Sequence, residues 1–290
     1  MVSQMILLSS IAALASASPL TLQVRQTNGT TGIIDSKVQG TLAKPSVSPT
    51  EGKTAAENKD EYTFFKGDGS KGAGWPTSDQ WINFNDMFTR NELFLGQGCV
   101  GNVKPNSKDE NAILKAEIAK VAAAAAIDPR FVLATVMQES NGCLRVKGTP
   151  SGEPGVFNPG VMQTFKGTGT CNVNNAKELE PCPEAQIQQM IVDGAQGVLT
   201  PDASGTPALQ AGLVQRITQA AGDASGQNYY KAARLYNSGA LAADGLLETA
   251  GQCGPPRTFG VPCYASDIAN RMLGWVSAPT KCDVKPAESC

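Results

Sequence analysis

The sequence predicts a secreted, mainly helical domain that is stapled by disulfides. Several segments place apolar residues at helical spacing, whereas alternating strand patterns are poor and no internal repeat is present. Residues 5–14 form an apolar run followed by Ala15-Ser16-Ala17, which is typical of a cleaved secretory signal peptide. All eight cysteines follow this segment, and an even number in a secreted chain indicates four disulfides. We therefore expect a mainly α fold with, at most, a small irregular β region.

Composition divides the chain into three parts. Residues 1–17 are the expected signal peptide, and residues 18–60 are rich in Thr, Ser, Gly and Lys without a sustained period. A segment with so little apolar material has little to bury, so we interpret 18–60 as a propeptide or a loosely held arm. Residues 61–290 form the expected folded domain. Its aromatic residues between 62 and 98 are expected mainly in the core, with sugar stacking as the alternative role.

Helical spacing then marks the elements of this domain in order. A helix is expected over 81–94, with Ser78 as a plausible N-cap. The next begins at Ser107, which forms a capping box with Glu110 before an apolar stripe that ends at Ala125. Further helices are expected over 131–140, 183–193, 208–221, 227–237 and 266–275. Residues 146–159 contain several glycines and prolines and predict a loop or a short irregular hairpin, and 200–207 predicts a surface loop.

The helix over 131–140 carries the first chemical signal. Asp128-Pro129 is a typical helix start, and Asn141-Gly142 is a typical stop. Glu139 lies three residues after Val136 and so continues a mostly apolar stripe. A carboxylate on a buried face is costly to ionise, so its pKa should rise, which makes a general acid available near neutral pH. The alternative is a solvated glutamate on a fraying last turn.

Four absences narrow the range of possible functions. The chain has no histidine, which removes Ser-His and Cys-His nucleophiles and leaves carboxylates as the acid–base groups of any enzyme. The cysteine spacings match no zinc pattern, so we expect neither a metal nor a cofactor. The net charge is −2 with no basic stripe, and no apolar run is long enough to span a bilayer. We expect a soluble, extracellular monomer that binds neither nucleic acid nor membrane.

The disulfide pairing cannot be read from the sequence, because eight cysteines allow about 105 pairings. Pairs that close short loops, Cys171–Cys182, Cys253–Cys263 and Cys282–Cys290, are the simplest hypothesis.

Four short motifs in fixed order resemble one family. They are ATVMQES at 134–140, GVMQ at 160–163, IVDGAQGVL at 191–199 and ARLYNSG at 233–239, with a weaker fifth, YASDIANRM, at 264–272. Together they resemble the soluble lytic transglycosylase and goose-type lysozyme superfamily over roughly residues 112–275. The resemblance implies a lysozyme-like fold and cleavage of β-1,4 bonds in N-acetylhexosamine polymers.

The resemblance also implies roles for particular residues. Glu139 would be the general acid/base and Ser140 would brace the turn behind it. Gly160 and Met162 would line the floor of the cleft and Gln163 would form a polar wall, although packing is the preferred role of Met162. Tyr236 and Asn237 would approach Glu139 from the opposite side, Tyr236 through its hydroxyl, unless they only end a helix.

The second carboxylate of this family is not clearly present. An inverting hydrolase needs a base that leaves room for a water, and Glu153 on the glycine-rich loop is the candidate, with a merely solvated residue as the alternative. A lone acid suffices if the substrate's own N-acetyl group or 6-hydroxyl takes part.

The expected partner is therefore a polysaccharide, peptidoglycan first. A chitin- or chitosan-directed enzyme of the same fold remains an alternative, because the acidic composition suits an anionic wall poorly. A secreted glycan-binding or effector protein without turnover is the other.

Overall fold

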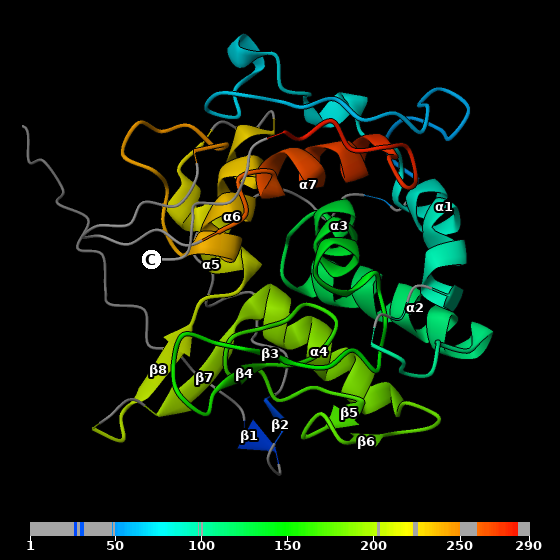
Figure 1. The fold of residues 1–290 in the computed structure, drawn as a ribbon, viewed down its shortest axis with the longest axis vertical. Coiled ribbons are helices and arrows are strands. Elements are labelled where there is room, and N and C mark those ends of the chain that lie inside the picture. Colours follow the sequence, from blue (N-terminus) through cyan, green and yellow to red (C-terminus); the bar gives the residue numbers. More distant parts are fainter. Residues whose placement is uncertain are drawn as a thin grey trace, which may run out of the picture.

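Helix α3 (Pro129–Ser140) lies at the centre of the fold, with the other helices arranged around it (Figure 1). The computed structural model describes residues 26–27, 30–31, 48, 50–97, 99, 101–201, 204–222, 226–249 and 260–283. The expected signal peptide lies outside these residues. Within them, the mainly helical class with small β elements is confirmed.

The ends of α3 follow from the residues that flank it. The Asp128 carboxylate accepts the Arg130 N–H at 2.9 Å, Pro129 occupies the first turn, and Asn141 ends the helix in a left-handed conformation at φ 53°. The predicted start and stop are thus confirmed. Asp128 also forms a buried ion pair of 2.6 Å with Arg130, which the sequence pattern did not indicate.

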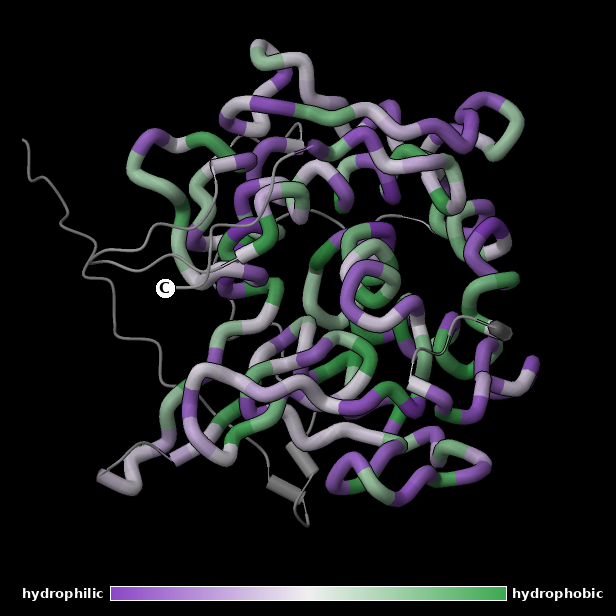
Figure 2. Tube along the Cα trace, viewed as in Figure 1, coloured by the Kyte–Doolittle hydropathy of each residue, from purple (hydrophilic) through white to green (hydrophobic). Residues whose placement is uncertain are grey.

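Six further α-helices surround α3 within the described residues. They are α1 (Phe84–Gln97), α2 (Lys108–Ala124), α4 (Glu184–Gln196), α5 (Leu213–Ala220), α6 (Gln227–Ser238) and α7 (Tyr264–Leu273). Helix α3 packs on α1, α2 and α7. Helix α4 packs on both α2 and α5, and helix α6 packs on both α5 and α7. Strongly hydrophobic residues concentrate in the central helices, and the outer loops are largely hydrophilic (Figure 2). The predicted capping box of Ser107 and Glu110 is confirmed at the start of α2.

Two predicted helices differ from the structure at their beginnings. Ser78 starts a short 3-10 helix, Ser78–Gln80, and α1 begins only at Phe84. Trp81 lies between them, fully buried, where its indole N–H donates to the Tyr230 hydroxyl at 2.7 Å. The helix expected over 208–221 begins at Leu213, because residues 207–210 pair with a neighbouring strand, and tertiary pairing overrides local propensity.

The β structure consists of short antiparallel pairs. They are β1 (Gln26–Thr27) with β2 (Thr30–Thr31), β3 (Thr149–Pro150) with β4 (Phe157–Asn158), β5 (Asn172–Val173) with β6 (Lys177–Glu178), and β7 (Val198–Pro201) with β8 (Pro207–Gln210). The β3–β4 pair is the hairpin expected between 146 and 159. The loop expected over 200–207 is shorter than predicted, since its two ends belong to β7 and β8.

Three disulfides join described residues. Cys171–Cys182 confirms one expected pair. Cys99 bonds to Cys143, which ties the region after α1 to the chain just beyond α3. Cys263 bonds to Cys282, so the expected pairs 253–263 and 282–290 are wrong. The chain after α7 returns along the helix and brings these two Cα atoms to 6.0 Å, a spatial proximity that spacing in sequence does not reveal. Cys253 and Cys290 lie outside the described residues.

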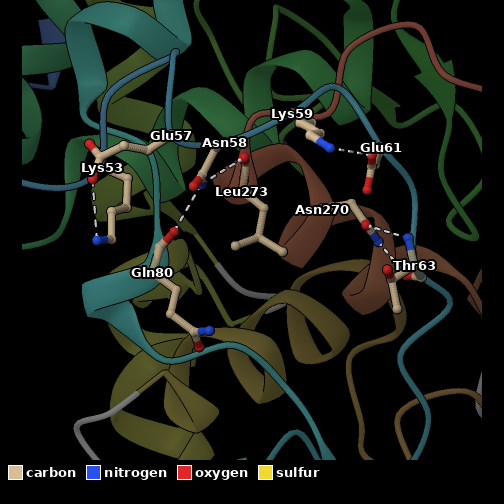
Figure 3. A pocket seen from close by; sticks show the side chains of 9 residues that line it. All are labelled: Lys53, Glu57, Asn58, Lys59, Glu61, Thr63, Gln80, Asn270 and Leu273. Carbon is tan, nitrogen blue, oxygen red and sulfur yellow. Dashed lines mark hydrogen bonds and ion pairs between the residues drawn. The ribbon is translucent and has the colours of Figure 1, made fainter.

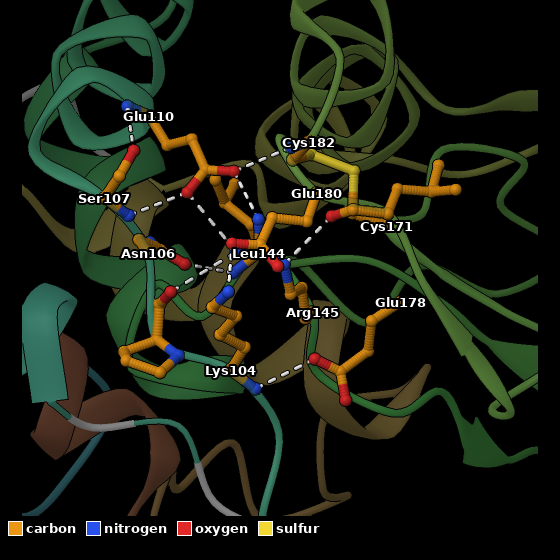
Figure 4. Close-up of polar contacts among 12 residues, drawn as sticks. Lys104, Asn106, Ser107, Glu110, Leu144, Arg145, Cys171, Glu178, Glu180 and Cys182 are labelled. Atoms are coloured by element: carbon orange, nitrogen blue, oxygen red, sulfur yellow. Dashed lines mark hydrogen bonds and ion pairs between the residues drawn. A yellow bond between two sulfur atoms is a disulfide. The ribbon is translucent and has the colours of Figure 1, made fainter.

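A buried polar network holds the segment that follows α3 (Figure 4). Arg145 forms an ion pair with Glu110, and its Nε donates to the Leu179 carbonyl at 2.9 Å. Glu110 also accepts the Cys182 N–H at 2.7 Å. Asn106 donates to the Gly142 carbonyl at 2.8 Å. The chain leaving α3 is thereby fixed to the start of α2.

The segment before α1 packs along α7. The Thr63 N–H donates to Asn270 Oδ1 at 2.8 Å, and Asn270 Nδ2 donates back to the Thr63 carbonyl at 2.7 Å. Even residues 51–60, part of the expected arm, are engaged: Asp60 accepts the Val276 N–H at 2.8 Å. The core role expected for the aromatics is confirmed for most of them, since Tyr62, Trp75, Trp81, Phe84 and Phe88 are buried.

Candidate active site

Glu139 is a half-buried residue in the last turn of α3. Its Oε1 accepts a hydrogen bond of 2.6 Å from the Tyr264 hydroxyl. Burial raises the pKa of Glu139 to about 7, and the hydrogen bond from Tyr264 opposes this rise. No lysine or arginine forms an ion pair with it in the described part of the chain. The carboxyl therefore holds a proton well above the pH at which an ordinary glutamate loses it.

Tyr264, the direct partner of Glu139, opens helix α7. Its ring is buried, and its pKa lies well above the ordinary value because of burial and the nearby Glu139 charge. It remains a hydroxyl donor at any pH at which the protein works. We did not select Tyr264 from the sequence, although it is the first residue of the weakest of the five motifs.

Tyr236 comes from α6 and reaches the same region. Its hydroxyl donates to the Met162 carbonyl at 2.8 Å and lies 3.4 Å from Thr164 Oγ1. Burial raises the pKa of Tyr236, and the charge of Glu139 adds to this rise. The hydroxyl that donates a hydrogen bond to Glu139 is thus that of Tyr264. Tyr236 interacts with Glu139 electrostatically, and its hydrogen bond to Met162 holds the GVMQ turn.

The GVMQ turn packs against α4 with little space. Gly160 has φ 75°, and a Cβ there would lie 2.7 Å from Met190 Cγ, so only glycine suits the position. Met162 is fully buried against Gly194 of α4, which makes it a packing residue in this structure. The side-chain amide of Gln163 forms hydrogen bonds to the backbone. Its Oε1 accepts the Thr149 N–H at 3.0 Å, and its Nε2 donates to the Gly160 carbonyl at 2.9 Å.

Ser140 and Asn237 connect the elements around this turn. The Ser140 hydroxyl lies within donating distance of the Val161 carbonyl, at 2.8 Å, and accepts the Gly142 N–H at 3.1 Å. It therefore joins the end of α3 to the GVMQ turn. The Asn237 Oδ1 accepts the Val261 N–H at 2.7 Å and so holds the chain that leads into α7.

Glu153 is not part of this group. It lies between β3 and β4 with an exposed carboxylate that forms an ion pair of 2.9 Å with Lys166. Lys166 also lies over the Phe165 ring. Glu153, the candidate second carboxylate, is thus an exposed residue whose charge is paired with that of Lys166.

Asp193 is a carboxylate that we did not select from the sequence, although it stands in the IVDG motif. It is buried in α4, and its Oδ2 accepts the backbone N–H groups of Thr168 at 2.6 Å and Gly169 at 2.8 Å. Burial raises the pKa of Asp193. With Gln189 bonded to its other oxygen at 2.6 Å, Asp193 pins the loop after the GVMQ turn to α4.

A pocket of about 450 Å³ lies elsewhere, between the segment before α1 and the end of α7 (Figure 3). None of the candidate residues lines it. Its polar groups are paired with one another, as Lys53 is with Glu57 at 3.3 Å. The described residues include no group of three or more His, Cys, Asp or Glu side chains that could hold a metal ion. None of the described helices is both long and apolar enough to cross a membrane.

Comparison with family models, curated proteins and solved structures found no match for this chain. The family resemblance therefore depends on the short motifs alone.

Proposed function

We propose that the protein is a secreted glycosidase that cleaves β-1,4 bonds in N-acetylhexosamine polymers, with peptidoglycan as its substrate and Glu139 as general acid/base. The observation that supports this most is the carboxyl of Glu139, whose pKa of about 7 suits proton donation near neutral pH. Glu139 lies near Tyr264 and Tyr236, and the hydrogen bond of Ser140 to the Val161 carbonyl holds the same end of α3. Three of the four family motifs contribute residues to this neighbourhood, and IVDG contributes the Asp193 anchor behind it.

In the proposed reaction, Glu139 gives its proton to the glycosidic oxygen as the bond to the anomeric carbon breaks. The departing sugar leaves with a free 4-hydroxyl. The N-acetyl oxygen of the remaining sugar attacks its own anomeric carbon and compensates the positive charge. Glu139, now ionised, then takes the proton of the 6-hydroxyl or of a water as that oxygen attacks the anomeric carbon and displaces the N-acetyl oxygen. The Tyr264 hydrogen bond stabilises the ionised form between the two steps.

A single carboxylate carries both steps in this proposal. Glu153 is exposed and paired with Lys166, so it is a poor base. The carboxylate oxygens of Asp193 accept hydrogen bonds from two backbone N–H groups and one side-chain amide. These arrangements favour a transglycosylase-like reaction with an internal nucleophile over inversion by an activated water.

A chitin- or chitosan-directed enzyme with the same acid is the second candidate. The net charge of −2 and the pI of about 5.4 favour it, because chitin is neutral, chitosan is cationic, and bacterial walls are anionic. A glycan-binding protein without turnover is the candidate from a different class, and the raised pKa of Glu139 argues against it.

The test is turnover by the parent and by Glu139→Gln on purified peptidoglycan and on chitin oligomers. The amide keeps the shape and accepts the Tyr264 hydrogen bond but delivers no proton, so we expect a loss of at least about a thousandfold. Circular dichroism checks that the variant is folded, and Glu153→Ala is the matched control, expected to keep its rate within about twofold. Mass spectrometry of the products distinguishes anhydro ends from reducing ends. Full activity in folded Glu139→Gln would refute the assignment.

A further inference from the structure

A polar side chain of α3 reaches across to α7 directly beside the candidate site. Gln138, which precedes Glu139, donates from Nε2 to Asp267 Oδ2 at 3.1 Å. Its Oε1 accepts the Arg271 Nε–H at 2.8 Å. Asp267 and Arg271 both belong to α7, which packs on α3 (Figure 1). The Gln138 amide thus bridges an acidic and a basic side chain of the neighbouring helix.

This bridge replaces a contact that α7 could form by itself. An aspartate followed four residues later by an arginine is well placed for a direct ion pair on one helix face. Within the described residues, however, Asp267 and Arg271 form no ion pair with each other. Gln138 supplies one hydrogen bond to each of them instead, so that α3 and α7 are joined at this point.

Other contacts hold the two charged side chains in place. Tyr62, from the segment before α1, donates to Asp267 Oδ1 at 2.7 Å. The Arg271 Cζ lies 4.9 Å from the centre of the Trp275 ring. Burial raises the pKa of Asp267 and lowers the pKa of Arg271 to about 10. Both groups are partly withdrawn from water, which strengthens the hydrogen bonds that Gln138 forms with them.

The bridge adjoins the Glu139–Tyr264 hydrogen bond on both helices. On α3, Gln138 directly precedes Glu139. On α7, Asp267 lies three residues after Tyr264, which is about one helical turn. A helix changes little in shape over one turn, so a link at Asp267 also fixes the place of Tyr264 relative to α3.

We propose that Gln138 is a positioning residue of the candidate site. Its bridge to Asp267 and Arg271 fixes the register of α7 on α3. That register brings the Tyr264 hydroxyl to the Glu139 carboxyl. The inference rests on the proposed function, in which Glu139 is the general acid. Gln138 acts through Tyr264 and not on the substrate, because it determines how firmly the donor to the ionised acid is held.

Removal of the amide should loosen this register without unfolding the protein. Gln138→Met keeps the length of the side chain, and Asp267 and Arg271 are then free to form a direct ion pair along α7. Glutamine and methionine are both uncharged, so a change in the pKa of Glu139 would reflect position and not a lost charge. The core face of α7 stays packed through its buried apolar residues Ala265, Ile268 and Met272.

The titratable groups that act on Glu139 are two tyrosines. Tyr264 of α7 donates a hydrogen bond to it, and Tyr236 of α6 interacts with its charge. Arg271 interacts in turn with Tyr264, and Asp193 of α4 with Tyr236. The pKa values of both tyrosines are raised above the ordinary value, so neither loses its proton near pH 7.

The test titrates the Glu139 carboxyl directly, by NMR of the side-chain carboxyl carbons in glutamate-labelled protein, with Glu139→Gln to assign the signal. In Gln138→Met the donor is held less firmly and supports the ionised form less. The pKa of Glu139 should therefore rise by roughly half a pH unit, and by no more than in Tyr264→Phe. The double variant should show no shift beyond that of Tyr264→Phe alone, because Gln138 acts through Tyr264.

Gln188→Met is the matched control. Gln188 of α4 donates from Nε2 to Glu117 Oε2 of α2 at 2.9 Å, and Glu117 is paired with Lys120. The control removes the same kind of bond between helices that carry neither Glu139 nor Tyr264, and should leave the pKa of Glu139 unchanged. Gln138→Asn, whose amide is one methylene too short to span both partners, should act as Gln138→Met does and decides the matter if the methionine variant does not fold.

Three results would overturn the inference: an unchanged pKa of Glu139 in the folded Gln138 variant, an equal shift in Gln188→Met, or full addition of the Gln138→Met and Tyr264→Phe shifts. Turnover of purified peptidoglycan and of chitin oligomers is scored separately. A Gln138-dependent pKa without any cleavage by the parent refutes the proposed function and leaves the link from Gln138 to Tyr264 standing. Cleavage with a pKa of Glu139 that does not depend on Gln138 does the reverse.

Discussion

At the scale of single residues, the site depends on one carboxyl group whose pKa is set by two opposing effects. Burial disfavours the charged form of Glu139, and the Tyr264 hydrogen bond favours it. A general acid must be protonated, so activity should be highest below pH 7 and fall as the pH rises through about 7. The balance between the two effects is therefore open to a mutational test.

Tyr264→Phe removes the hydrogen bond and keeps the ring. Without the donor, the ionised form of Glu139 loses support, its pKa rises further, and the alkaline limb of the pH–rate profile should move up by roughly half to one pH unit. The rate below the limb should fall, because the carboxylate left after proton donation is less stable. The measurement is kcat/KM against pH, with Tyr236→Phe as the comparison: it should move the limb less, since its hydroxyl bonds to Met162 and not to Glu139. A limb that stays in place in Tyr264→Phe contradicts the assigned pair.

The sequence pattern predicts the raised pKa of Glu139 but does not indicate its hydrogen-bond partner Tyr264, for a physical reason. The periodic apolar stripe of a single helix places a glutamate on its buried face, and burial follows from that local pattern. The partner hydroxyl lies 125 residues further along the chain, so only tertiary packing brings it there.

At the scale of elements, the segment that follows α3 is held by the buried ion pair of Arg145 and Glu110. Arg145 and Glu110 are almost fully buried, and Glu110 also accepts the Cys182 N–H. Removal of one partner of a buried pair leaves the other charge uncompensated. The position of Glu139 thus depends on α2 as well as on α3.

Arg145→Met should lower the free energy of unfolding by about 3 kcal/mol or more, because Glu110 would remain buried without its cation. Urea unfolding followed by circular dichroism measures this. Lys104→Met is the matched control, since it removes the cation of the half-exposed pair Lys104–Glu180, and should change stability by less than about 1 kcal/mol. Similar effects of the two substitutions would show that burial of the first pair is energetically unimportant.

The elements themselves were predictable to different degrees. Helices with a cap and a stripe, such as α2 and α3, have their start and stop encoded within a few residues. The strand β8 was not predictable, because Ala208 and Leu209 suit a helix and adopt an extended form only through pairing with β7. Trp81 likewise leaves the helical pattern to reach Tyr230.

At the scale of the whole molecule, α7 closes the fold over α3 and brings Tyr264 to Glu139. Cys263, directly before Tyr264, is bonded to Cys282, and the segment before α1 hydrogen-bonds along α7 at Asn270. The site is therefore assembled from parts of the chain that are far apart in sequence.

Replacement of Cys263 and Cys282 by alanine should destabilise the protein by roughly 3 kcal/mol, the usual effect of opening a loop of this size. It should also loosen the Tyr264 donor and move the alkaline limb of activity upward, in the direction expected for Tyr264→Phe. The matched control replaces Cys171 and Cys182, which are 11 residues apart, against 19 for Cys263 and Cys282, and which do not adjoin Tyr264. The control should lose stability without a shift of the limb. Equal shifts in both variants would contradict a specific link between the Cys263–Cys282 bond and the site.

The placement of Tyr264 also has a consequence for biosynthesis. Synthesis from the N-terminus produces α3 long before α7, so Glu139 is at first without its hydrogen-bond donor. No fragment that ends before residue 264 contains the complete pair. Under the proposed function, a chain that ends earlier would hold Glu139 without the hydrogen bond that lowers its pKa, and the Cys263–Cys282 bond, which forms in an oxidising compartment, would help to fix the donor in place.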